Sequence, residues 1–352
     1  MMKKVSLISN INIKTSSQVR VVKKITKSYI SQLDTAKKST IRAGFGQGLI
    51  DCAKKNSEIR VLTADLTDSL KLTDFKNMYP KRFFQMGICE QNMMSAAAGM
   101  SIIGKIPFVC SYAVFSPGRN WDQLRVSVCY SNHNVKIIGG HAGLTTGPDG
   151  ATHQALEDIA ITRVLPKLKV IVPCDAEETR KATIAIAKDL SPCYLRLTRE
   201  NSLTITTKKS SFEIGVANVL DEGTDVAIFA CGIMLQFALK AREKLKEEGI
   251  SAAVINMHTI KPLDVKTLVK YAKKCRAIVS CEEHQKMGGL GSAISEVLAQ
   301  EVPTAQEFVA MQDCFGESGS GYDLLEKYRL STKEIVLATK RVLKRKKKVF
   351  KA

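Results

Sequence analysis

Residues 87–112 read GICEQNMMSAAAGMSIIGKIPFVCSY, and they set the pattern for the whole chain. From Glu90 to about residue 103, small and apolar side chains predict a closely packed helix. The run IPFVCS that follows, at residues 106–111, is typical of a buried strand. A helix followed by a short buried strand is the repeating unit of a wound parallel sheet, so this segment predicts an α/β fold.

The same alternation extends on both sides of this segment, over residues 39–200. We predict helices at residues 42–55, 90–103, 121–130 and 176–188 and after His153, and strands at 59–64, 106–111, 135–139, 169–173 and 193–197. Active-site loops of such sheets lie at the carboxyl ends of the strands. The polar or aromatic residues that fall at predicted strand ends are Asp65, Tyr112, His141 and Arg199.

A polar stretch, LTITTKKSS at residues 203–211, interrupts the alternation, and a second α/β unit follows it. Its predicted strands lie at 225–230, 252–257, 277–284 and 307–311, and its predicted helices at 234–248, 264–275 and 332–343 and from the GGLGSA run at 288–293. We therefore predict two parallel-sheet, three-layer domains, at 39–200 and 212–345, with a linker at 201–211. A basic N-terminal extension at 1–38 and a basic tail at 346–352 flank them.

Composition narrows the class of protein. The 352 residues are 45% hydrophobic, which is enough for about two ordinary domains. The ten cysteines show no CxxC spacing and lie mostly in apolar runs, so we expect buried thiols in a reducing, cytoplasmic compartment and no cysteine metal site. No apolar stretch approaches the ~20 residues needed to span a bilayer. A membrane is therefore not an expected partner.

The formal net charge of +19 raises the question of nucleic acid. Much of the excess lies in the two terminal segments, and no basic surface interleaved with aromatic residues is evident between them. Solvated tails are the simplest interpretation, and nucleic acid is not favoured as a partner. The acid-poor, Ser/Thr-bearing N-terminus is also compatible with an organelle transit peptide, which leaves targeting open.

Six motifs in a fixed order resemble the pyrimidine-binding and C-terminal domains of transketolases. The motifs are TADL at 63–66, GICEQNM at 87–93, HAGLTTGPDGATHQ at 141–154, INMHTIKPLD at 255–264, EEHQKMGGLGSA at 282–293 and QDCFGESG at 312–319. The resemblance covers residues 39–343, both domains but neither tail. It implies thiamine diphosphate as the cofactor.

One element of that family is missing. Transketolases hold Mg²⁺ and the cofactor diphosphate with a GDG…NN element, and this sequence contains no GDG triplet and no Asn-Asn pair. The resemblance therefore implies one subunit of a split transketolase. Its partner would be an N-terminal subunit that carries the GDG…NN motif and the Mg²⁺, in an α2β2 assembly, and no metal ligands are assigned to this chain.

The resemblance assigns the cofactor-binding side to four residues. Glu90 corresponds to the carboxyl group beside N1′ of the aminopyrimidine, which promotes loss of the proton from C2 of the thiazolium. Apolar neighbours such as Ile88 and Met93 would desolvate this carboxyl group. The alternative is a carboxylate that serves only the helix dipole. Tyr112 and Phe115 correspond to the aromatic pair around the pyrimidine, and Asp65 belongs to the TADL motif.

The loop at 141–154 corresponds to the substrate side of transketolases. His141 and His153 would bind hydroxyl and carbonyl oxygens of a ketose, and both are assigned catalytic roles because such groups can transfer protons near neutral pH. Asp149 would contact the C2 hydroxyl of the donor. Pro148 departs from the pattern, since many relatives carry an acidic residue there.

Recognition of the sugar phosphate would fall to Arg42, Ser69 and Arg199, by their spacing from Asp65 and His153. A guanidinium group suits a phosphate dianion because its fork of N–H donors matches the oxygens. Arg119 is a weaker candidate for the same pocket.

Other interpretations stay open at this point. Deoxyxylulose-phosphate synthase shares the GATHQ loop, but it carries arginine at the position of His141 and its loop is one residue shorter. The β subunit of 2-oxoacid dehydrogenases has the same layout without the histidine of THQ. A non-catalytic basic scaffold belongs to a different class. The GGLGSA run could also be a nucleotide loop, although it lacks the GxGxxG spacing, and a close packing turn is the simpler explanation.

Overall fold

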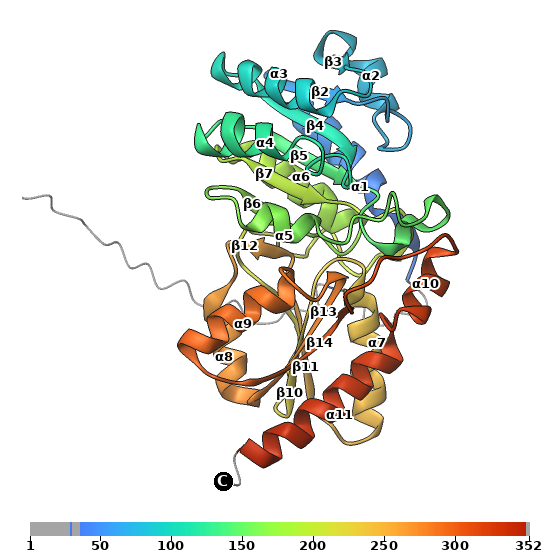
Figure 1. The fold of residues 1–352 in the computed structure, drawn as a ribbon, viewed down its shortest axis with the longest axis vertical. Coiled ribbons are helices and arrows are strands. Elements are labelled where there is room, and N and C mark those ends of the chain that lie inside the picture. Colours follow the sequence, from blue (N-terminus) through green and yellow to red (C-terminus); the bar gives the residue numbers. More distant parts are fainter. Residues whose placement is uncertain (1–28, 30–35, 350–352) are drawn as a thin grey trace, which may run out of the picture.

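The structure is a computed structural model that describes Tyr29 and residues 36–349. Most of the predicted N-terminal extension, and the end of the predicted basic tail, lie outside the described residues. Two domains are stacked along the long axis of the molecule (Figure 1). Each is a mostly parallel sheet with helices on both faces, which confirms the predicted α/β fold of two three-layer domains.

The first domain is built on a seven-stranded sheet with the order β12-β6-β7-β5-β4-β2-β3. Its strands are β2 (Ile59–Thr63), β3 (Phe83–Gln85), β4 (Ile106–Tyr112), β5 (Lys136–Gly140), β6 (Lys169–Ile171), β7 (Cys193–Arg196) and β12 (Thr259–Lys261). All neighbours are parallel except β12, which pairs antiparallel with β6 at the edge. Because β12 comes from the second half of the chain, the first sheet is completed by the second domain.

Helices cover both faces of this sheet. Successive side chains along a strand point to opposite faces, and both faces of these strands are apolar. Val61, Phe108 and Ile138 face one side, where they pack with α1 (Ile41–Ala53), α2 (Thr73–Met78) and α6 (Ala176–Lys188). Leu62, Val109 and Ile137 face the other. The elements on that second side are α3 (Glu90–Ile102), the short α4 (Trp121–Gln123), the π-helix η3 (Leu124–Tyr130) and α5 (Asp158–Arg163). The short 3-10 helices are η2 (Pro80–Arg82) and η4 (Leu144–Asp149).

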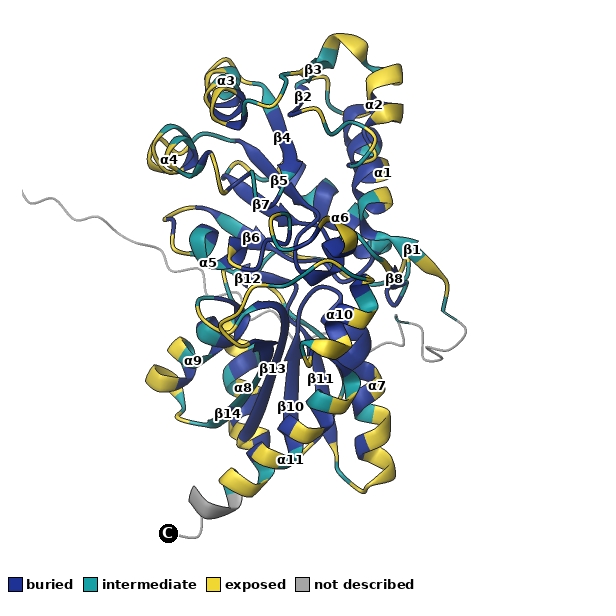
Figure 2. Cartoon of the chain, turned by 45° about the vertical axis from the view of Figure 1, so that its right-hand side comes forward, coloured by how far each residue is buried: buried dark blue, intermediate teal, exposed yellow. Residues whose placement is uncertain are grey.

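The second domain has a five-stranded sheet with the order β14-β13-β10-β11-β9. Its strands are β9 (Asn218–Asp221), β10 (Val226–Ala230), β11 (Ala252–Asn256), β13 (Ala277–Gln285) and β14 (Ala305–Met311), and only β9 is antiparallel. Figure 1 shows α8 (Val265–Cys275) and α9 (Leu290–Glu301) on one face and α7 (Met234–Glu247) and α11 (Thr332–Val349) on the other. The buried strands form the centre of each domain, and exposed residues lie on the outer sides of the helices (Figure 2).

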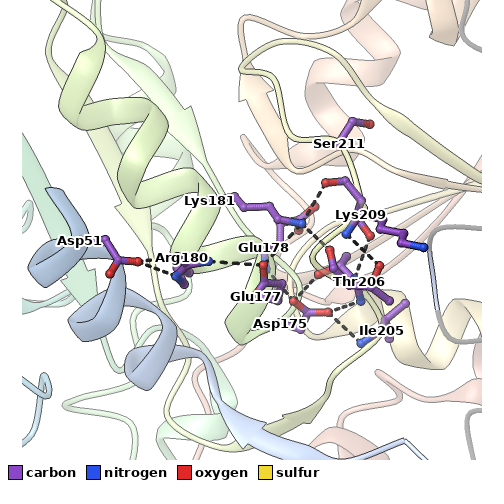
Figure 3. Close-up of polar contacts among 12 residues, drawn as sticks. Asp51, Asp175, Glu177, Glu178, Arg180, Lys181, Ile205, Thr206, Lys209 and Ser211 are labelled. Carbon is purple, nitrogen blue, oxygen red and sulfur yellow. Dashed lines mark hydrogen bonds and ion pairs between the residues drawn. The ribbon is translucent and has the colours of Figure 1, made fainter.

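The predicted linker at 201–211 is tied to the first domain. Residues Asn201–Leu203 form β8, which pairs antiparallel with β1 (Lys38–Thr40). Two residues further, the backbone N–H groups of Ile205 and Thr206 donate to the carboxylate of Asp175 at 2.8 and 2.6 Å. The same carboxylate caps the start of α6, through Glu178 N at 2.8 Å (Figure 3). The buried Asp175 thus binds both the first turn of α6 and the segment that connects the two domains.

The last helix is longer than predicted. It was expected to end near residue 343, but α11 continues to Val349, so residues 346–349 of the predicted tail are helical. Lys346 Nζ donates to the carbonyl oxygens of Asp225 and Cys275, which holds this turn against the domain.

At the GGLGSA turn, a carboxylate of the protein takes the backbone N–H groups that a phosphate would need. Both oxygens of the buried Glu282 carboxylate accept N–H groups at the start of α9, from Leu290 at 2.6 Å and Gly291 at 2.8 Å. A Cβ atom on Gly289 would overlap this carboxylate. Because the protein's own carboxylate occupies the helix N-terminus, the turn serves close packing, as the simpler explanation predicted.

Eight of the ten cysteines are buried, as predicted, while Cys89 is partly buried and Cys314 exposed. Within residues 36–349, no helix combines the length and the apolar character needed to cross a membrane.

Candidate active site

The predicted site residues meet at the carboxyl edge of the first sheet. Tyr112 ends β4, His141 follows β5 directly, and Arg199 follows β7 by three residues. These three strands are parallel neighbours, so their ends share one edge. A chain of contacts links the predicted residues to one another, with the exception of Asp65.

Glu90 is the first residue of α3 and only 3% exposed. Met93 is buried as expected, but Ile88 is 72% exposed and so does not form the apolar shell predicted for it. The guanidinium of Arg119 approaches both carboxylate oxygens of Glu90, at 3.3 and 3.4 Å, and also lies over the ring of Phe115 at 4.1 Å from the centroid. Asn120, which is fully buried, donates from Nδ2 to the backbone carbonyl of Glu90 at 3.2 Å. The turn after β4 therefore places an aromatic face and a cation directly beside this buried carboxylate.

Four rings form a cluster next to this carboxylate. Tyr112 stacks on His141, with ring centroids 3.9 Å apart, and lies 6.1 Å from Phe115 in a nearly parallel arrangement. His153 meets both aromatic rings edge-on, at 5.3 Å from Phe115 and 6.3 Å from Tyr112. The two predicted substrate histidines therefore lie on the aromatic pair that was predicted to hold the cofactor.

His141 is held as a neutral imidazole. Burial, with the positive charges of Arg42 and Arg199 and its neighbour His153, lowers the pKa of His141 to about 3. Its Nε2 lies 3.3 Å from Arg42 Nη1, and an arginine N–H can only donate, so Nε2 accepts. The ring proton is then on Nδ1, a buried atom without a hydrogen-bond partner among the residues that the structure describes. His141 thus carries one unused N–H donor.

This electrostatic arrangement predicts that His141 does not titrate near neutral pH. The Cε1 resonance of His141 should keep its chemical shift from pH 8 to pH 5 in the folded chain, whereas in the unfolded chain it should titrate near ~6.5. Because the unfolded chain then binds more protons below pH ~6.5, this group lowers the free energy of unfolding as the pH falls toward 3. NMR titration with His141→Gln for assignment measures this. A folded-state midpoint between 6 and 7 would contradict it.

Arg42 joins three segments of the site. Its Nη1 donates to the carbonyl of Ser69 at 2.6 Å and approaches His141, and its Nη2 donates to the carbonyl of Arg199 at 3.0 Å. Burial lowers the pKa of Arg42, while its Nε has no hydrogen-bond partner within the described part of the chain. The three residues predicted to bind phosphate are therefore neighbours. Arg42 already donates hydrogen bonds to the backbone carbonyls of the other two.

Arg199 faces the outer end of the loop. Its Nη1 donates to the carbonyl of Thr146 at 2.6 Å and to Asp149 Oδ1 at 3.1 Å, and about a third of each side chain of this ion pair is exposed. Pro148, the departure from the family pattern, is exposed and lies within η4, directly before Asp149. An anion in solvent can reach Arg199 without unfolding this arrangement.

Asp65, two residues after β2, is exposed and exchanges hydrogen bonds with Gln85, at 2.8 and 3.1 Å, so its role in cofactor binding stays a prediction. Arg119, proposed only as a weak phosphate ligand, is instead the partner of Glu90. Asn120 was not singled out at all. Its position directly after Arg119 gave no signal, because the contact with Glu90 spans 30 residues.

Comparison with known proteins identifies the family. Residues 37–203 match the family described as the transketolase pyrimidine binding domain, and residues 215–335 match the transketolase C-terminal domain. A putative transketolase C-terminal section from Methanocaldococcus jannaschii is 40% identical over 311 residues, which is 88% of this chain and 96% of that protein. The chain belongs to the transketolase family.

Two further relatives are named as a split-gene transketolase and as a transketolase subunit. A solved structure titled "Split gene transketolase, inactive beta4 tetramer" is 44% identical, with a TM-score of 0.82 and coverage of 87% of this chain and 98% of that one. A 6-deoxy-6-sulfo-D-fructose transketolase subunit of Clostridium sp. (strain MSTE9) is 40% identical over 298 residues, 85% of this chain and 92% of that protein. Transketolase sections encoded as separate chains are therefore among its relatives.

Membership in this family implies the use of thiamine diphosphate, and the described residues fit one end of that cofactor. A flat aminopyrimidine needs an aromatic face and a carboxyl group at its edge. Phe115 and Tyr112 supply the faces, and the buried Glu90 supplies the carboxyl group. Asn120 Oδ1 is a further buried polar atom here, and no hydrogen-bond partner for it lies in Tyr29 or residues 36–349. When bound, the cofactor would supply the nucleophilic carbon that the protein's side chains lack.

Proposed function

We propose that this chain is the pyrimidine-side subunit of a thiamine-diphosphate-dependent transketolase, which moves a two-carbon ketol unit from a ketose phosphate to an aldose phosphate. The observation that supports it most strongly is the continuous path of contacts from the buried Glu90 through the aromatic rings to residues 141–154, called the histidine loop below. A cofactor ring at Phe115 would thereby have a substrate site immediately beside it.

The residues of the chain would divide the work by position. Glu90, as the buried carboxylate, would exchange a proton with the pyrimidine edge. His141 would donate its free Nδ1–H to a hydroxyl or carbonyl oxygen of the sugar, since its low pKa keeps it neutral. His153, which is more exposed and touches the same rings, would serve a second oxygen. Asp149 would contact the donor hydroxyl at the open end of the loop.

The anionic end of the sugar would lie at Arg199, with Ser69 and Arg42 behind it. Arg199 is the most accessible of these groups, and its ion pair with Asp149 can yield to a stronger anion. One relative is named for a sulfonated fructose. We therefore propose a sugar with a terminal phosphate dianion as the donor. A sugar with a terminal sulfonate is an alternative donor to be tested.

The diphosphate and the Mg²⁺ would be held by a partner chain with the GDG…NN motif, in an α2β2 assembly. Large apolar side chains are exposed at both ends of α3, the helix that begins with Glu90: Ile88 is 72% exposed, Ile102 68% and Ile103 71%. Exposed apolar residues near an incomplete site support a protein partner there. A cytoplasmic location belongs to the same proposal, supported by the eight buried thiols.

The donor assay tests this function. We expect the complex with the partner subunit to convert xylulose 5-phosphate plus ribose 5-phosphate, and to use pyruvate plus glyceraldehyde 3-phosphate poorly, because pyruvate has neither the hydroxyl groups nor the phosphate that the site would bind. Arg199→Ala should mainly raise KM for phosphorylated sugars, since it removes binding energy but no reacting group. Its backbone contact with Arg42 is kept in that variant. Initial rates against donor concentration give both constants.

Arg329→Ala is the matched control, because Arg329 also forms a partly exposed ion pair, with Glu334 in the second domain. It should leave both constants unchanged. If only pyruvate with glyceraldehyde 3-phosphate gives product, with release of carbon dioxide, the chain is a deoxyxylulose-phosphate synthase subunit. If neither pair of substrates reacts and the chain binds nucleic acid in a salt-dependent way, the scaffold interpretation replaces the enzyme.

A further inference from the structure

A carboxylate of the second domain reaches into the histidine loop of the first. Glu283 lies on β13, near the end of that strand, and is 3% exposed. Its Oε1 accepts the backbone N–H of Thr145 at 2.6 Å, across 138 residues of sequence. The same carboxyl group packs on Gly143, where a Cβ atom would overlap it. The two domains are therefore joined here by a hydrogen bond and by close packing that requires glycine at position 143.

Arg196 holds the backbone of Glu283, and its Nη1 lies 4.0 Å from Oε2 of the Glu283 carboxylate. Its guanidinium, 2% exposed, donates to the carbonyl of Glu283 at 2.8 Å and to the carbonyl of Ala155 at 3.2 Å, and its Nε donates to Asp158 at 2.8 Å. Ala155 is also the residue whose carbonyl accepts the N–H of Gly143 at 2.8 Å. Both ends of the loop are thus tied to the pair of Arg196 and Glu283.

The loop needs such ties because its own backbone is permissive. Gly143, Gly147 and Gly150 all have positive φ, a region that glycine enters without strain, so these positions do not by themselves select one conformation. His141 is at φ +52° as well, which is uncommon for a residue with a side chain. Its carbonyl accepts the hydroxyl of Thr146 at 2.5 Å, one residue from the N–H that Glu283 holds.

We propose that Glu283 is a positioning residue, which fixes the turn at Thr145 and Thr146 and through it the orientation of His141 toward the substrate. This inference rests on the proposed function, because it assigns the second domain a part in that same site. The second domain also contacts the loop through the carbonyl of Glu317, which accepts from Gln154 Nε2 at 2.9 Å. The C-terminal domain would therefore complete the substrate loop and not merely stabilise the fold.

The neighbouring residue offers a matched control. Glu282 is buried like Glu283, and burial raises the pKa of each to about 7. Its carboxylate binds the N-terminus of α9 and does not touch the loop. Glu282→Gln and Glu283→Gln are the same chemical change at adjacent buried positions, so a general loss of stability appears in both. Only Glu283→Gln should change the conformation of the histidine loop, because only Glu283 binds Thr145.

Two measurements carry the test. In hydrogen exchange of the isolated full chain at pH ~8, above the raised pKa of Glu283, Glu283→Gln should speed exchange in the peptide covering 141–155 by about tenfold, because a neutral amide oxygen accepts the Thr145 N–H less strongly than a carboxylate. Glu283→Asp should do the same, since the shortened side chain cannot reach Thr145. In the complex with the partner subunit, both variants should lower kcat about tenfold with little change in KM, as expected for misplaced reacting groups.

Glu282→Gln should lower the melting temperature without changing loop exchange or kcat. Loop exchange that is unchanged in both Glu283 variants, or equally fast in Glu282→Gln, overturns the inference. So does a loosened loop with unaltered kcat. If the wild-type complex has no ketol transfer activity, the proposed function fails instead, and the exchange result still decides whether Glu283 holds the loop.

Discussion

The isolated chain should bind thiamine diphosphate more weakly than about 1 mM, with no dependence on Mg²⁺, and adding the partner subunit should produce tight, Mg²⁺-dependent binding. The physical reason is that the described site offers contacts to only one end of the cofactor. Stacking on Phe115 and a contact to Glu90 leave the charged diphosphate without ligands, and a Kd of 1 mM already requires about 4 kcal/mol. Titration calorimetry with and without Mg²⁺ measures this.

A control separates a missing half-site from a misfolded chain. The isolated chain should unfold in one cooperative transition, and its melting temperature should not rise with the cofactor, since a ligand that does not bind the native state cannot stabilise it. With the partner present, the transition should move upward as cofactor is added. Micromolar, Mg²⁺-dependent binding by the isolated chain would contradict the split-enzyme proposal and place a diphosphate site in this sequence.

The fold was predictable where the pattern is local. Helix α6 has the predicted bounds, 176–188, because Asp175 caps its first turn and a polar face alternates with buried residues. The strands that were missed, β1, β3, β8, β9 and β12, have only three or four residues. They exist because of partners elsewhere in the chain: β12 pairs with β6, and β8 with β1. A short edge strand carries too few residues for a periodic signal of its own.

The sequence motifs predicted which residues belong to the site, but they did not predict which of these residues contact one another. The sequence placed Tyr112, His141 and Arg199 at strand ends, and the structure brings them to one edge. It could not show that Arg119 lies on Glu90, because these residues come from different elements, 29 positions apart. The contact of Glu283 with the loop likewise depends on how two domains pack. Pairings across elements follow from tertiary structure, which composition and spacing do not contain.

Glu90→Gln should lower ketol transfer by the complex at least ~100-fold, the loss typical of a general acid–base group, while the folded structure and the assembly remain. Exchange of the C2 proton of thiamine diphosphate for deuterium should slow in parallel. The structure indicates why folding should not suffer. Glu90 is 3% exposed, so a neutral amide is easier to bury than a carboxylate, and its partner Arg119 keeps 49% of its side chain in solvent.

The melting temperature of Glu90→Gln should therefore equal or exceed that of the wild type, and this combination distinguishes a chemical role from a structural one. A carboxylate that served only the helix dipole would behave in the opposite way: its loss would lower stability by about 0.3–1 kcal/mol and leave turnover intact. Glu301→Gln, an exposed carboxylate at the end of α9, controls for the change in net charge and should alter neither quantity. Unchanged C2 exchange in Glu90→Gln would mean that another residue activates the cofactor. Because Arg119 is the charged group in contact with both Glu90 and Phe115, it would then be the first residue to test.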